Sequence, residues 1–204
     1  MATFIKAGFW EQLCKPCKGY KGWLNLDEFV NSRVVPNGLF AQTGNSIDIT
    51  GTTVETTLIN GGVGTVSIPA NGFSIGDSYR AVFGGVLNSA NNQTIRIRVK
   101  AGAITLLDSG DQSINNSTND VFSLNIDFTI RQVGTPGVAS IVSIGSFHYI
   151  KTSNASTQGF AFNVINNTTF DTTISNTLNV TVEWGSNNAG NSIYSDLFVL
   201  NKTY

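Results

Sequence analysis

The stretch Val121-Phe122-Ser123-Leu124-Asn125-Ile126-Asp127-Phe128-Thr129-Ile130-Arg131-Gln132 decides the fold. Its apolar and polar side chains alternate, and the apolar ones are Phe122, Leu124, Ile126, Phe128 and Ile130. Successive side chains of a strand point to opposite faces, so this pattern predicts a long β-strand with one buried face and one polar face. Such a strand needs neighbouring strands and a second layer that covers its apolar face.

After Asn37 the chain consists of short apolar runs separated by Gly, Asn, Asp and Ser. These runs predict further strands near residues 46–49, 54–59, 64–68, 78–87, 94–100, 104–107, 138–150, 160–164, 178–185 and 192–200. A chain of 204 residues is long enough for one β domain with a sizeable core. The sequence therefore predicts an all-β fold, a jelly-roll-like antiparallel β-sandwich over residues 38–204.

The composition limits the classes of partner. Charged residues make up 12% of the chain, about half the usual share of ~25%. With 12 basic and 13 acidic residues the net charge is -1, which gives no overall attraction to nucleic acid or to an anionic membrane. No run approaches the roughly 18 apolar residues of a membrane span, and the first residues do not resemble a cleaved signal peptide. We expect no nucleic acid and no membrane among the partners.

Residues 1–37 differ from the rest of the chain, because they hold both cysteines and two of the three tryptophans. Gly and Pro interrupt every apolar period here, so only residues 24–30 are expected to form a short helical turn. Aromatic side chains with a polar group are good interface anchors, which favours an N-terminal docking arm. The alternative is that this arm folds back and caps its own domain.

The two cysteines form the unit Cys14-Lys15-Pro16-Cys17. This spacing suits half a zinc site, a redox dithiol or a disulfide. A zinc site needs two more ligands, and the chain has a single histidine, His148, and no other cysteine. A thioredoxin-like motif would need a βαβ setting, which the pattern does not predict. Free thiols or a structural hairpin are the simplest interpretation, and a metal or disulfide role stays open.

The predicted strand at 94–100 places Arg96, Arg98 and Lys100 on one face. They form a solvated face, pair with charges on neighbouring strands, or meet an acidic patch on a neighbouring subunit.

The predicted closing strand, 192–200, is apolar on both faces. Simple alternation puts Ile193, Leu197 and Val199 on one side and Tyr194, Phe198 and Leu200 on the other. Such a strand is central in the packing or contacts another subunit.

No cluster of reactive residues is evident. The chain lacks a Gly-x-Ser-x-Gly elbow and a phosphate-binding loop, and Gly61–Gly64 and Gly84–Gly85 fit a turn and a bulge better. The Asn- and Asp-rich residues 108–120 contain oxygen ligands for calcium, but their spacing departs from that of an EF-hand. Clusters of this kind are also ordinary turn material. We therefore expect no enzyme and no cofactor.

Three stretches resemble a β-sandwich module of tailed-bacteriophage virion proteins. They are Ile68-Pro69-Ala70-Asn71-Gly72-Phe73-Ser74-Ile75-Gly76-Asp77-Ser78-Tyr79-Arg80, the strand Thr94–Lys100, and Leu178-Asn179-Val180-Thr181-Val182-Glu183-Trp184-Gly185. In that module an Ile-Pro-Ala-Asn turn leads through a Gly-Asp corner into a strand, and a Val-x-Trp strand lies in the last third. The similarity covers most of residues 50–200.

The segment Gly19-Tyr20-Lys21-Gly22-Trp23-Leu24-Asn25-Leu26-Asp27 is similar to the leaders of phage head-fibre and capsid-decoration proteins. The resemblance implies a non-enzymatic virion structural protein, a homotrimer assembled in the host cytoplasm. Its arm would bind the major capsid protein or another virion protein. The implied anchors of the arm are Trp10, Tyr20, Trp23 and Phe29.

The leading alternative is a carbohydrate- or receptor-binding module, with a host-surface glycan as partner. Exposed aromatic side chains would then stack on sugars, and the candidates are Tyr79, Tyr149 and Tyr194. A hydrolase on the same scaffold is a third alternative, and it would need an acidic pair in one groove.

Overall fold

The computed structural model describes residues 4–6, 23–25, 38–151 and 156–204. The chain divides into two units, Met1–Asn37 and Gly38–Tyr204, and each is described by itself. In the first unit, β1 (Phe4–Lys6) and β2 (Trp23–Asn25) form an antiparallel pair. The helical turn expected over 24–30 is wrong where it overlaps β2. The rest of that range lies outside the described residues.

The second unit contains a large antiparallel sheet with the strand order β14-β13-β12-β8-β16-β3-β6, and β4 also pairs with β16. Its strands are β3 (Gly38–Gln42), β4 (Ile49–Thr50), β6 (Gly62–Gly64), β8 (Ser78–Ser89), β12 (Ser117–Gln132), β13 (Ser140–Lys151), β14 (Ser156–Asn166) and β16 (Ser192–Lys202).

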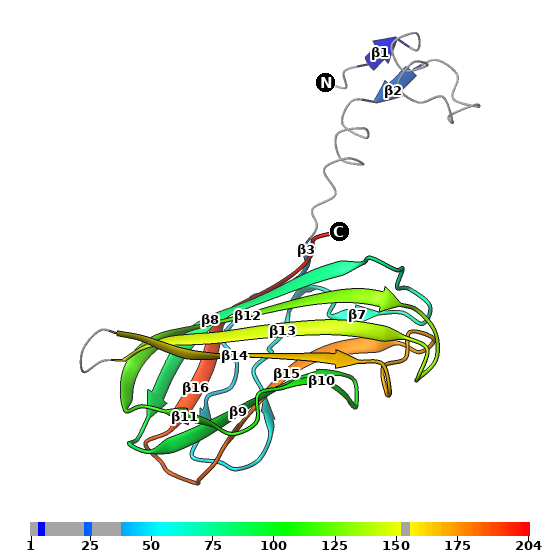
Figure 1. Ribbon diagram of the computed structural model, residues 1–204. Coiled ribbons are helices and arrows are strands. Elements are labelled where there is room, and N and C mark those ends of the chain that lie inside the picture. The colour runs from blue at the N-terminus through cyan, green and yellow to red at the C-terminus, as the bar shows by residue number, and fades with distance from the viewer. Residues whose placement is uncertain (1–3, 7–22, 26–37, 152–155) are drawn as a thin grey trace. The chain divides into compact units, whose positions relative to one another are not determined.

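A smaller antiparallel sheet has the order β10-β9-β15-β5, with β11 pairing with β9 and β7 with β15. Its strands are β5 (Thr56–Thr57), β7 (Ser67–Ile68), β9 (Gln93–Ala101), β10 (Ile104–Asp108), β11 (Gln112–Ile114) and β15 (Asn176–Trp184). Figure 1 shows β8, β12, β13 and β14 side by side in one layer, with β9, β10 and β15 in the other. The predicted antiparallel β-sandwich is confirmed.

Strand β12 lies between β8 and β13 in the large sheet, with Ile126 opposite Ala81 on one side and Gly145 on the other. All five of its predicted inward side chains are at most 5% exposed. The predicted burial pattern of this strand is therefore confirmed. An inward face this apolar requires the second layer, because an exposed sheet face of this kind would aggregate.

Aromatic rings and one indole hydrogen bond fix the packing of the core. The rings of Phe83 and Phe198 stack with centroids 4.2 Å apart and planes at 5°. From the small sheet, Trp184 is fully buried and its Nε1 donates to the carbonyl oxygen of Ile49 in β4 at 3.0 Å. A buried indole needs such an acceptor, so this bond orients the ring and links the two sheets.

Strand β16 contains a β-bulge. Ser195 pairs with Gly85 and Leu197 with Gly84, so one extra residue stands between them. The extra residue reverses the alternation, and Ile193 shares the buried face with Phe198 and Leu200. Our assignment of Ile193 to the face of Leu197 and Val199 is therefore wrong.

Gly85 lies opposite this bulge. An added Cβ would lie 2.0 Å from the carbonyl oxygen of Tyr194, so only glycine fits there. The bulge expected at Gly84–Gly85 is thus confirmed, but the extra residue lies in β16, the strand that pairs with these glycines.

Two buried serines should respond in opposite ways to replacement by alanine. Among the described residues, Ser143 Oγ is buried without a hydrogen-bond partner, so Ser143→Ala should raise the free energy of unfolding by about 1 kcal/mol. Ser195 Oγ instead donates to Leu58 O at 2.6 Å and accepts from Gln42 Nε2 at 3.1 Å. Ser195→Ala should lower the free energy by about 1–2 kcal/mol. Urea unfolding measures both, and a loss of stability in Ser143→Ala contradicts this account.

Candidate functional site

The outer face of the small sheet carries a network of ion pairs. Arg96 of β9 makes a two-pronged contact with Asp108 of β10, from Nε to Oδ1 at 2.8 Å and from Nη2 to Oδ2 at 2.6 Å. The neighbouring Lys100 contacts Glu55 Oε1 at 2.9 Å. Two-pronged arginine–carboxylate pairs are among the stronger charged hydrogen bonds.

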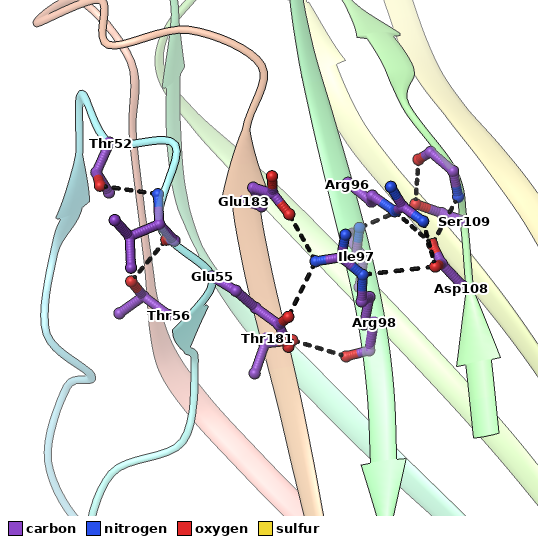
Figure 2. A network of polar contacts seen from close by, with 12 residues as sticks. Thr52, Glu55, Thr56, Arg96, Ile97, Arg98, Asp108, Ser109, Thr181 and Glu183 are labelled. Atoms are coloured by element: carbon purple, nitrogen blue, oxygen red, sulfur yellow. Dashed lines mark hydrogen bonds and ion pairs between the residues drawn. The ribbon is translucent and has the colours of Figure 1, made fainter. Parts of the chain in front are cut away.

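Arg98 lies at the centre of the network, where its side chain is only 14% exposed. Its Nη1 contacts Glu183 Oε2 at 2.6 Å and Glu55 Oε2 at 3.1 Å, and its Nε lies 3.5 Å from Asp108 Oδ2. Figure 2 shows these side chains converging from β9, β10, β15 and the loop before β5. Thr181 adds a hydrogen bond to Glu55 at 2.7 Å. The network therefore connects the strands across this face.

The charges of this network balance. Three cations meet three carboxylates of the same chain, so the pairing of the basic row with charges on neighbouring strands is confirmed. The contact with an acidic patch on a neighbouring subunit stays a prediction. Hydrogen bonding from Arg96 lowers the pKa of Asp108. Burial alone would raise the pKa of Glu55, but hydrogen bonds from Thr181 and Lys100 outweigh it and lower the value.

The central strand β12 is mainly polar on the outward face of the large sheet, where it places Ser123, Asn125, Asp127 and Thr129. Apolar side chains gather on the strands to both sides of it, and we call this surface the outer apolar face. It is formed by Val63, Val82, Val86, Val121, Val142, Ile144, Ile150, Ile165, Tyr194, Leu197 and Val199. Strand register brings several of them together, since Val199 pairs with Val82, and Val86 pairs with both Tyr194 and Val121. Leu197 is 49% exposed and Val63 is 71% exposed. Apolar side chains gathered in this way mark interaction surfaces.

This face carries little net charge. Arg80 and Asp127 point outward from paired strands, and Arg80 Nε contacts Asp127 Oδ1 at 2.7 Å. Both side chains are about half exposed, so the pair adds little to stability. The five strands from β14 to β16 have at least 11 residues each, so the face covers about 900 Å² at the usual strand spacing. A standard protein–protein interface buries about 800 Å² per partner.

The predicted Gly-Asp corner ties the start of β8 to the end of the chain. Gly76 has a φ of +93°, which glycine adopts readily. Asp77 is 7% exposed, and its carboxylate accepts from the Ser74 N–H at 2.9 Å and contacts Lys202 Nζ at 2.7 Å. Burial alone would raise the pKa of Asp77, but these partners and the hydroxyl of Tyr79 lower it.

A polar hollow of about 470 Å³ lies at one end of the sandwich. Four separate stretches of chain form its wall, and they are residues 48–50, 88–90, 116–118 and 189–192. Side chains of Asp, Asn, Ser and Thr predominate there. Sequence patterns indicated only the oxygen-rich residues 108–120, because the other parts of the wall are far apart in the chain.

Most of the predicted arm anchors and the cysteine pair lie outside the described residues. This applies to Trp10, Tyr20, Phe29, Cys14 and Cys17. Trp23 begins β2. The docking role of the arm and the state of the cysteines stay predictions.

The aromatic side chains expected to stack on sugars are largely unavailable for that role. Tyr79 is 7% exposed and donates its hydroxyl to Asp77. Tyr149 is 2% exposed, and its hydroxyl accepts from the Asn115 N–H at 2.9 Å. Only Tyr194 of the three is partly exposed. The prediction that these three tyrosines form an aromatic platform for sugars is therefore wrong.

One of the three carboxylates in the stretch suggested for calcium is already bound within the chain. Asp108 is bound by Arg96 and by the Gly110 N–H at 2.9 Å. His148 lies exposed in β13, within the strand. In the described parts of the chain, no three His, Cys, Asp or Glu side chains gather as a metal site. No helix in these parts is long and apolar enough to cross a membrane.

Comparisons with known proteins give likenesses in structure only. No protein-family model matches this chain, and no curated protein sequence matches it. Lectin II from Ulex europaeus is similar in structure with a TM-score of 0.36 and 8% identity, over 80% of this chain and 92% of the lectin. The lectin UEA-II complexed with galactose gives a TM-score of 0.30 and 8% identity, over 82% of this chain and 91% of that one. Likenesses at this level carry no argument about function.

The ion-pair network should contribute measurably to stability, whereas the exposed pair should not. Glu55→Ala removes the contacts to Arg98, Lys100 and Thr181 and should lower the free energy of unfolding by about 1–2 kcal/mol. Asp127→Ala, the matched control, should lower it by about 0.5 kcal/mol or less. Chemical denaturation measures both variants. Equal effects contradict a special role for the network.

The Asp77 corner should make stability depend on pH. A carboxyl with a lowered pKa in the folded state stabilises the protein above its unfolded-state pKa, and the contribution is lost as the pH falls through the folded-state value. Asp77→Asn should therefore cost about 2 kcal/mol at neutral pH and progressively less below about pH 4. Denaturation series across pH measure the difference from the unaltered protein, with Asp127→Asn as control. A difference that stays constant down to acid pH contradicts the assignment.

Proposed function

We propose that this protein is a non-enzymatic structural component of a tailed-bacteriophage virion, a homotrimeric head fibre or capsid decoration protein. The observation that supports self-assembly is the outer apolar face of the large sheet. The phage setting rests on the sequence resemblance, in which an N-terminal arm over residues 1–37 binds the capsid. In this proposal the sandwich is held by the arm and by copies of itself.

Copies of the same chain suit the outer apolar face better than a charged partner does. The face has no net charge, since Arg80 and Arg131 balance Asp127 and the exposed Asp196, so identical copies do not repel one another strongly across it. The whole outward face of the five long strands, the polar row of β12 included, covers about 900 Å², which is comparable with one side of a standard interface. Closed symmetry around an axis then buries the face in every copy.

The small sheet offers a poorer surface for assembly. Burying its outer face would remove six charged side chains from water, including Arg98 and its carboxylate partners. The pairs already satisfy one another within the chain. We therefore assign the subunit contact to the large sheet.

A charge placed on the outer apolar face should break the assembly. Leu197→Asp inserts a carboxylate into a surface that the proposed trimer buries, so the full-length variant should run as a monomer in light scattering, while the unaltered protein runs as a trimer. Ile174→Asp is the matched control, because Ile174 is 48% exposed but lies outside this face, and it should leave the mass unchanged. A monomeric unaltered protein overturns the proposal. A dimeric unaltered protein is consistent with association through the outer apolar face but contradicts the proposed trimer.

Binding of the full-length protein to phage capsids tests the proposed virion role. Full-length protein carrying Trp10→Ala and Trp23→Ala should keep its oligomeric mass and lose binding to phage capsids that lack their own copy of the protein. Binding that is unaffected by these replacements contradicts docking through the arm.

A further inference from the structure

The polar hollow has the size and construction of a binding site. Its volume of about 470 Å³ lies within the range of roughly 300–1,000 Å³ that is usual for small-molecule sites. It lies where β8 ends and where β12 and β16 begin, beside Asp48, which precedes β4, and Thr50, which ends it. The rigid strands of the large sheet thus support its wall.

Hydrogen bonds within the wall hold it in one shape. Asn88 Nδ2 donates to Ser192 Oγ at 3.1 Å, and Asn88 Oδ1 accepts from the Asn119 N–H at 2.7 Å. Ser117 Oγ donates to the carbonyl oxygen of Asn115 at 3.1 Å. These bonds join β8 to β16 and to the start of β12. A preformed wall reduces the entropy lost when a ligand binds.

Other polar side chains of the hollow remain available. Asp48, Thr50 and Asn116 are exposed, and within the described residues their side chains make no hydrogen bond or ion pair. A carboxylate accepts from two hydroxyl groups at once, an amide both donates and accepts, and a threonine hydroxyl does either. This set complements adjacent hydroxyl groups on a ring.

We propose that the hollow binds a neutral carbohydrate of one or two sugar rings. Asp48 is the only charged side chain among the lining residues, so an anionic sugar would be repelled. Asp, Asn, Ser and Thr side chains predominate in the lining, which disfavours a lipophilic ligand. The binding mode is one of hydrogen bonds from Asp48 and Asn116 to sugar hydroxyls, without aromatic stacking. It uses residues of a single subunit and does not depend on the proposed assembly.

Isothermal titration of the full-length protein tests the site with pairs of sugars. Glucose and galactose are the neutral probes, and glucuronic and galacturonic acids are their matched anionic controls. At least one neutral sugar should bind saturably, and its uronic acid should bind about tenfold or more weakly, as expected for a carboxylate facing Asp48.

Single replacements in the lining test whether the sugar binds in the hollow. Asp48→Ala should weaken the neutral sugar about tenfold or more, and Asn116→Ala should weaken it about threefold, because charged hydrogen bonds contribute more than neutral ones. Asp111→Ala, which removes an exposed carboxylate elsewhere, should leave the affinity unchanged. Since both replaced side chains are exposed, all three variants should keep the melting temperature of the unaltered protein. The proposal is overturned if no neutral sugar binds, if uronic acids bind as tightly, or if Asp48→Ala has no effect.

Discussion

Burial of one face of the large sheet against the small sheet is the interaction on which the structure depends. The inward side chains of β12 are almost fully covered, and each large apolar side chain buried in this way contributes about 1.5–3 kcal/mol. Because a strand alternates with a period of two, fixing the inward residues also fixes which residues face outward. The character of both outer faces follows from this one constraint.

The two outer faces of the sandwich differ in the kind of side chain that they expose to solvent. Across the small sheet, carboxylates meet Arg96, Arg98 and Lys100, which satisfies the charges and leaves a solvated face. Across the large sheet, the strands on both sides of the polar outward row of β12 carry apolar side chains, and Leu197 and Val63 remain open to solvent. A solvated ion-pair network resists burial, whereas apolar surface favours it. The same sandwich therefore has one face suited to water and one suited to association.

The sequence predicts the parts of this structure that repeat along the chain. The alternation in 121–132 and 94–100 identified β12 and β9, and the inward residues were assigned correctly. Strands β1, β2, β3 and β11 were missed because three to five residues contain too few alternations to stand out. The extra residue in β16 reversed the predicted faces beyond Ser195, since a bulge depends on the partner strand. The partner Glu55 lies in a loop, whose position no periodicity sets.

A single polar hollow at the strand ends is expected to bind a sugar weakly. A site with a few hydrogen bonds to one or two sugar rings gains little free energy, because each bond replaces one with water. Copies joined through the outer apolar face would present several hollows on one particle. Linked sites gain avidity of about 10²–10⁴ without any new contact, provided that the ligands span them. In the proposed assembly, avidity would supply the affinity that hydrogen bonds from Asp48 and Asn116 alone do not.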